Sequence, residues 1–123
     1  MRVGTVDKVS LEEFARMTGS KLGGPVRVYG DAQRQICRVA VLGGAGEDFA
    51  FEALAASADV YVTGEMGYHK GTAAVDEGLC VLEAGHAATE NPAISMLAEG
   101  LQNAANVVQY NVRVLCSANG LFL

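Results

Sequence analysis

A histidine and a glutamate stand four residues apart directly after an apolar run, and both are side chains that bind metal ions. His86 and Glu90 lie in the segment Glu83–Glu90, which follows the run Gly78–Leu82. That run is typical of a buried strand, and open α/β sheets usually place ligand sites beyond the carboxyl ends of their strands. Two such side chains at this position can share one divalent metal ion. The alternative is a capping or hydrogen-bonded pair without a metal.

Two ligands do not complete a metal site, because zinc, manganese or iron takes about four to six donors. Glu65 and His69 are candidates for the same site, since they follow the run Asp59–Thr63, which we expect beside Gly78–Leu82. Their spacing would suit one face of a helix. In the alternative interpretation, Glu65 is a carboxylate that favours a helix start and His69 is a hydrogen-bonding group at the surface.

The glycine-rich segment Gly43–Gly46 follows the apolar run Ile36–Leu42 and precedes a helical pattern. Such a segment can bind an anion through its backbone N–H groups. It lacks the spacing of a dinucleotide-binding or Walker loop, so a tight turn that lets a helix approach the sheet is the favoured interpretation. No Ser-His-Asp, Cys-His or Gly-x-Ser-x-Gly arrangement is recognisable, which leaves metal-assisted activation of water as the chemistry best supported.

Composition limits the class of protein. The chain has 123 residues, half of them apolar, with a formal charge of -5, which suits one domain with its own core. Lys and Arg are scattered, so binding to nucleic acid is not expected. The first residues lack a secretory signal and no apolar run is long enough to span a membrane, which predicts a cytoplasmic protein. Cys37, Cys80 and Cys116 are expected to be reduced and buried, with metal ligation or a nucleophilic role as the alternative.

Three successive units of strand followed by helix predict an α/β fold with a largely parallel or mixed sheet flanked by helices. The predicted strands are Ile36–Leu42, Asp59–Thr63 and Gly78–Leu82, and the predicted helices are 48–57, a segment that ends near Gly78, and 91–105. The last helix has Asn91 as its cap, Pro92 at its first position and an apolar stripe that we expect to pack on the sheet.

The two ends of the chain have less regular patterns. Residues 1–35 predict a strand at Arg2–Val6, a helix that starts with the capping box Ser10–Glu13, and an extended run at Val26–Tyr29. After the last helix we expect a strand within Val107–Leu115 and a turn at Ser117–Gly120.

Three runs, in this order, resemble the carboxyl-terminal half of the Nif-three-like dinuclear metal centre family, many of whose members are labelled GTP cyclohydrolase type-two homologues. The runs are Val39–Gly46, Ala58–Glu65 with Tyr68–His69, and Glu83–Glu90. Residues 9–31 are also similar to the stretch with which longer members re-enter the core after an inserted domain. The resemblance implies a re-entry segment at 1–35 and a metal-site half-domain at 36–123, which is one half of a two-domain fold.

The resemblance also implies a site for two metal ions between two related halves. His86 and Glu90 match the ligands from this half, whereas Glu65 and His69 match a loop near the metals. The other half supplies a His-His pair and an Asp, and this chain has only two histidines, so one copy cannot form the full centre. Family members form hexamers, so we expect a homo-oligomer, or a separate chain that supplies the missing half.

The resemblance thus implies a metal-dependent hydrolase that acts, in its complete form, on a nucleotide or a similar phosphorylated compound. His86 and Glu90 would hold the metal that activates water, and Glu65 or His69 would assist proton transfer. Zinc, iron and manganese all suit these donors. The competing hypothesis is a non-enzymatic interaction or regulatory module with a vestigial metal site.

Overall fold

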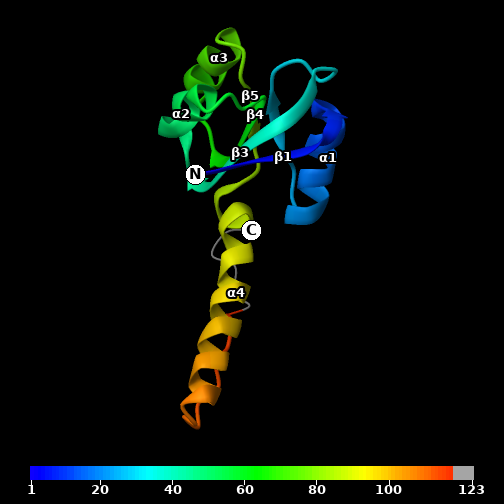
Figure 1. Cartoon of the computed structure of the whole chain (residues 1–123). Helices are drawn as coiled ribbons and strands as arrows, with labels where there is room; N and C mark the ends of the chain where they lie inside the picture. Colours follow the sequence, from blue (N-terminus) through cyan, green and yellow to red (C-terminus); the bar gives the residue numbers. More distant parts are fainter. Residues whose placement is uncertain (118–123) are drawn as a thin grey trace. The chain divides into compact units, whose positions relative to one another are not determined.

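The computed structural model describes residues 1–117 and contains a five-stranded sheet with helices on its two faces (Figure 1). The chain forms two compact units, Met1–Thr89 and a second that begins at Glu90. In chain order the elements are β1 (Arg2–Ser10), α1 (Leu11–Leu22), β2 (Arg27–Tyr29), β3 (Gln35–Ala45), the 3₁₀ turn η1 (Glu47–Phe49), α2 (Ala50–Ala55), β4 (Val60–Glu65), α3 (Tyr68–Asp76), β5 (Cys80–Glu83) and α4 (His86–Val107). The predicted α/β fold is confirmed.

The strand order β1-β3-β4-β5-β2 makes the sheet mixed. Its centre is parallel, because α2 connects β3 to β4 and α3 connects β4 to β5. The two outer strands, β1 and β2, pair antiparallel with β3 and β5. The three strands predicted for the centre are confirmed, and β3 continues through Gly43, Gly44 and Ala45, which were expected to form a turn.

Strand β4 supplies two hydrophobic cores, because its side chains alternate between the faces of the sheet. Tyr61 is fully buried in the core on the side of α2 and α3. Val60 and Val62 belong to the opposite core, which also contains Leu11 of α1. The Tyr61 hydroxyl donates to the Gly46 carbonyl at 2.8 Å, so burial leaves this polar group satisfied, and the same burial raises the pKa of Tyr61.

Helix α1 has the expected capping box. The Ser10 hydroxyl accepts a hydrogen bond from the Glu13 N–H at 3.3 Å. Gly23 ends the helix with a φ of 74°, a conformation that glycine adopts without the strain of a side chain.

The boundary that the family resemblance implies at residue 36 remains a prediction.

Helix α4 begins earlier than its local signals predict. It starts at His86, and Pro92 lies inside the helix instead of at its first position. Proline has no N–H, so one intrahelical hydrogen bond is missing there. Within the second unit Ile94, Leu97 and Leu101 are 51%, 60% and 52% exposed, and the expected packing of the apolar stripe on the sheet stays a prediction.

The segment after α4 is not a strand, so the strand predicted within 107–115 is wrong. The side chain of Gln102 binds its backbone instead: the amide nitrogen donates to the Val112 carbonyl at 3.2 Å, and the amide oxygen accepts from the Val114 N–H at 2.8 Å. A side chain of α4 thus replaces the neighbouring strand that this segment would need. Most of the turn expected at Ser117–Gly120 lies outside the described residues.

The cysteines only partly follow the prediction. All three are free, but only Cys80 is buried, and burial raises the pKa of its thiol. Cys37 and Cys116 are exposed, so the expectation of three buried thiols is wrong for these two. Within the part of the chain that the structure describes, every helix is too short or too polar to cross a membrane.

Candidate metal-binding site

Two predicted site residues meet where β4 and β5 end. The parallel pairing aligns Thr63 with Glu83, and it continues beyond β5, because the Gly85 N–H donates to the Gly64 carbonyl at 3.0 Å. Glu65 follows Gly64, and His86 follows Gly85. The register of two neighbouring strands therefore brings together two side chains that lie far apart in the sequence.

Glu65 and His86 form a direct side-chain contact. The distance from His86 Nδ1 to Glu65 Oε1 is 2.8 Å. Both side chains remain partly open to solvent, with 45% of His86 and 56% of Glu65 exposed. A carboxylate bound to one ring nitrogen of a histidine is a common arrangement beside protein-bound metals, since it fixes the orientation of the imidazole.

The glycine-rich end of β3 supports the start of α4. The Gly44 N–H donates to the Thr89 hydroxyl at 3.0 Å, and that hydroxyl lies 2.9 Å from the carbonyl oxygens of Gly85 and His86. A Cβ atom at Gly64 would meet the Gly44 carbonyl, the Thr89 hydroxyl and the His86 Cα at 2.7–2.8 Å. The sequence predicted that the glycines let a helix approach the sheet. The helix that approaches is α4, which starts at His86, and not α2, which follows the glycines in the chain.

His69 contacts residues of its own helix, Tyr68 and Thr72. It belongs to the first turn of α3, where its ring packs edge-on against Tyr68 with centroids 5.5 Å apart. Its carbonyl accepts from the Thr72 hydroxyl. Glu65 and His69 do not share a helical face as their spacing suggested, because Glu65 is the last residue of β4.

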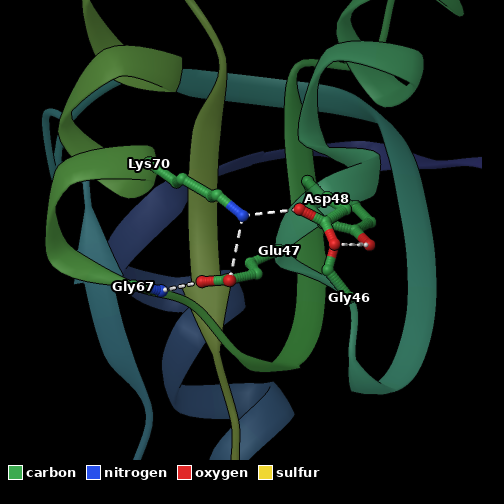
Figure 2. A network of polar contacts seen from close by, with 6 residues as sticks. Gly46, Glu47, Asp48, Gly67 and Lys70 are labelled. Atoms are coloured by element: carbon green, nitrogen blue, oxygen red, sulfur yellow. Dashed lines mark hydrogen bonds and ion pairs between the residues drawn. The ribbon is translucent and has the colours of Figure 1, made fainter.

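A network of charged side chains holds the loop between β4 and α3 (Figure 2). Lys70 binds the carboxylates of both Glu47 and Asp48, and Glu47 also accepts the Gly67 N–H at 3.0 Å. The hydrogen bond from Lys70 lowers the pKa of Glu47, and that from Lys70 to Asp48 raises the pKa of the lysine. Gly67 follows Glu65 by two residues, so the network anchors the backbone beside the site.

On the other side of β5 the structure places residues that the sequence did not single out. Arg27 pairs with Glu83 at 3.1 Å, and the Tyr29 hydroxyl donates to the same Glu83 oxygen at 3.3 Å. A cavity of about 340 Å³ lies there, lined by Pro25, Val26, Arg27, Glu83 and Gly85. In the sequence, only the position of Glu83 at the end of a strand could have pointed to this group of residues. The pairing of β2 with β5, which brings Arg27 and Tyr29 to Glu83, has no local sequence pattern.

The types of donor fit a divalent metal, but their number is small. Glu90 follows His86 by four residues in α4 and opens the second unit. An imidazole and carboxylates suit zinc, iron or manganese. Among residues 1–117, however, no group of three or more His, Cys, Asp and Glu side chains is placed to hold a metal ion. Water or donors from another polypeptide would have to complete such a site.

Comparison with known proteins identifies the family. A family profile, Duf34/NIF3 (NGG1p interacting factor 3), matches residues 1–120. The chain belongs to the Duf34/NIF3 family. A relative from Nostoc sp., named GTP cyclohydrolase 1 type 2 homolog, is 36% identical over 106 residues, which are 83% of the NIF3 chain and 40% of the relative. A relative of the same name from Bacillus subtilis is 43% identical over 87 residues, which are 69% and 23% of the two chains.

The crystal structure of a Bacillus cereus protein related to NIF3 has the same architecture. It matches with a TM-score of 0.93 at 30% identity, covering 98% of this chain and 34% of that protein. The resemblance seen in the three sequence runs is therefore confirmed. This NIF3 chain spans less than half the length of the relatives it matches, and the cyclohydrolase name is that of the whole relatives.

Proposed function

We propose that this chain contributes one side of a divalent-metal site in a cytoplasmic, metal-dependent hydrolase. His86 and Glu90 are the ligands in this proposal, and zinc, iron or manganese is the metal, with two ions per complete site. The substrate class is a nucleotide or a similar phosphorylated compound, which follows from the cyclohydrolase name of the relatives. Because the chain matches only part of each relative, the activity belongs to the complete assembly.

The contact between His86 and Glu65 is the observation that carries this proposal. It lies at the carboxyl ends of two neighbouring parallel strands, where α/β sheets bind ligands. Glu90 belongs to the same helix as His86, four residues further on, and this spacing puts two side chains on one helical face. An exposed imidazole with a carboxylate one turn away is a common ligand pair for divalent metals.

The chemistry divides between the metal and the protein. A bound divalent metal lowers the pKa of water and stabilises negative charge. In this chain His86 and Glu90 would bind the metal, and Glu65, at the end of β4, or His69, in the first turn of α3, would assist proton transfer. Reactions on phosphorylated compounds need these roles because negative charge develops on oxygen atoms during bond cleavage.

The proposal includes a second polypeptide, either another copy of this chain or a chain that corresponds to the remainder of the relatives. The shortage of donors within residues 1–117 supports this, since a closed site needs more ligands. Exposed apolar side chains of α4 support it too, because Ile94, Met96 and Leu97 are all half or more exposed. Apolar surface of this kind is commonly covered by a partner.

Metal binding tests the function. The purified chain, incubated with zinc and desalted, should retain the metal by elemental analysis and melt about 10 °C higher at a free zinc concentration of roughly 100 times Kd. His86→Ala should lose both effects. His69→Ala is the matched control, because it removes the other histidine and should keep them.

The opposite result would favour the interaction module. If the wild-type chain retains no zinc, iron or manganese, alone or mixed with a chain that corresponds to the remainder of the relatives, and its melting temperature stays the same in their presence, the metal-dependent hydrolase loses its basis. Equal metal retention by wild type and His86→Ala would contradict the assignment of this ligand. The exposed apolar residues of α4 would then be the feature to explain.

A further inference from the structure

We propose that Glu65 is a positioning residue that fixes the tautomer and orientation of His86. In the arrangement we infer, the His86 Nδ1–H donates to Glu65 Oε1, whose distance from Nδ1 is 2.8 Å. The lone pair of the neutral ring then lies on Nε2, which is the nitrogen that a metal would bind. This inference rests on the proposed metal site, but its first test does not need a metal.

The backbone on both sides of Glu65 is held in place. In β4, Glu65 is paired with Ala45 of β3, and the Gly64 carbonyl accepts the Gly85 N–H at 3.0 Å. Two residues later, the Gly67 N–H donates to Glu47 at 3.0 Å. An exposed contact between two such side chains usually contributes little because both side chains must be ordered. Here the backbone is already held in place, so only the side-chain torsions must be ordered for the carboxylate to stay close to the imidazole.

His86 is fixed as firmly as its partner. Gly85 turns the chain with a φ of 89°, so α4 starts one residue after the hydrogen bond to β4. The Thr89 hydroxyl lies 2.9 Å from the His86 carbonyl. The absence of a side chain at Gly64 lets the His86 Cα come close to β4. Both members of the pair are therefore placed by main-chain contacts, which is the condition for one carboxylate to select one tautomer.

The position of Glu65 suits a role in orienting the imidazole of His86. Its Oε1 is occupied by the imidazole nitrogen that would not bind the metal, so the carboxylate acts through His86. A carboxylate in this relation raises the basicity of the ligand, and its removal typically weakens metal affinity about 10–100-fold. We expect that loss for Glu65→Ala. Glu65→Gln keeps an oxygen acceptor for the Nδ1–H and should recover most of the affinity.

Nitrogen NMR of the imidazoles tests the inference in metal-free protein. The chain has only two histidines, so the ring signals of His86 are assigned by their loss in His86→Ala, and His69 serves as the internal reference. At about pH 8.5, above the range in which an ordinary imidazole titrates, wild type should show a His86 ring protonated at Nδ1. Glu65→Ala should shift His86 towards the Nε2–H tautomer and leave His69 unchanged. Glu65→Gln should retain the wild-type signals.

The His86 tautomer and the zinc affinity of the Glu65 variants show whether Glu65 orients the imidazole. Identical His86 tautomers in wild type and Glu65→Ala would overturn the inference, as would a wild-type ring already protonated at Nε2. A wild-type chain that binds no zinc would contradict the proposed function alone, because the tautomer is read without metal. If zinc binds, Kd should rise about 10–100-fold in Glu65→Ala and much less in Glu65→Gln. Equal losses in both variants would indicate that the negative charge, not the orientation, is what matters.

Discussion

Replacing Gly64 by alanine is expected to destabilise the first unit, because three groups surround this position at close range. An added Cβ would lie 2.7 Å from the Gly44 carbonyl oxygen, 2.7 Å from the Thr89 hydroxyl oxygen and 2.8 Å from the His86 Cα. Favourable contacts between such atoms occur at roughly 3.5 Å. Two of the three neighbours are main-chain atoms, so a change of side-chain rotamer cannot relieve the contact.

The magnitude follows from the shifts that are required. Overpacking of this kind costs about 1–3 kcal/mol. Displacing Thr89 also weakens the hydrogen bond that its hydroxyl accepts from the Gly44 N–H at 3.0 Å, which contributes about 1 kcal/mol. The free energy of unfolding should therefore fall by about 2–4 kcal/mol, and the melting temperature by roughly 10 °C.

Urea unfolding followed by circular dichroism measures this loss. Gly4→Ala is the matched control, because a Cβ at Gly4 of β1 has no atom within 4 Å. The control should unfold near the wild-type urea concentration. If Gly64→Ala and Gly4→Ala unfold together, the close approach of α4 to β4 does not exist as described, and the argument for a fixed His86 fails with it.

Two further predictions concern carboxylates that bind backbone N–H groups. Asp59→Asn should lower stability at neutral pH, because the N–H groups of Arg38 and Cys37 hold the pKa of Asp59 below its usual value. Stability from a lowered folded pKa is present above the unfolded value, about 3.9, and is lost as the pH falls through the folded pKa, so the unfolding free energies of wild type and variant should converge in acid. Glu47→Ala should speed amide exchange at Gly67, whose N–H then has no carboxylate to bind.

Each of these has a matched control. Asp76→Asn removes an exposed carboxylate of α3 and should leave the stability at neutral pH close to that of wild type. Asp48→Ala removes a partner of Lys70 but not the acceptor of the Gly67 N–H. An unfolding difference for Asp59→Asn that persists unchanged below pH 3, or equal Gly67 exchange rates in Glu47→Ala and Asp48→Ala, would contradict the respective argument.

The central part of the fold was predictable because its signals are local. Runs of β-branched and apolar residues define β4 and β5, and short helical segments between such runs predict parallel neighbours. Parallel neighbours end at the same edge, so the sequence also predicted that Glu65 would lie near the segment containing His86. The contact between those two side chains, which the structure shows at 2.8 Å, depends on an exact register that no local pattern contains.

The errors have a common physical cause, which is that a contact from elsewhere outweighed a local signal. Asn91 and Pro92 look like a helix start, but Gly85 and Thr89 provide an earlier one through contacts with β3 and β4. The residues after α4 have strand-like composition, yet their backbone is bound by Gln102. Metal ligation by His86 and Glu90 and the role of His69 remain predictions, because they depend on atoms that this chain does not supply.

The dependence of the Glu65–His86 contact on glycines has a consequence for finding such sites in other genomes. A search that scores only side chains able to bind metal will accept sequences in which a bulkier residue at the position of Gly64 keeps the two groups apart. Residues without functional groups, at positions 64 and 85, should therefore be weighted as heavily as the histidine itself.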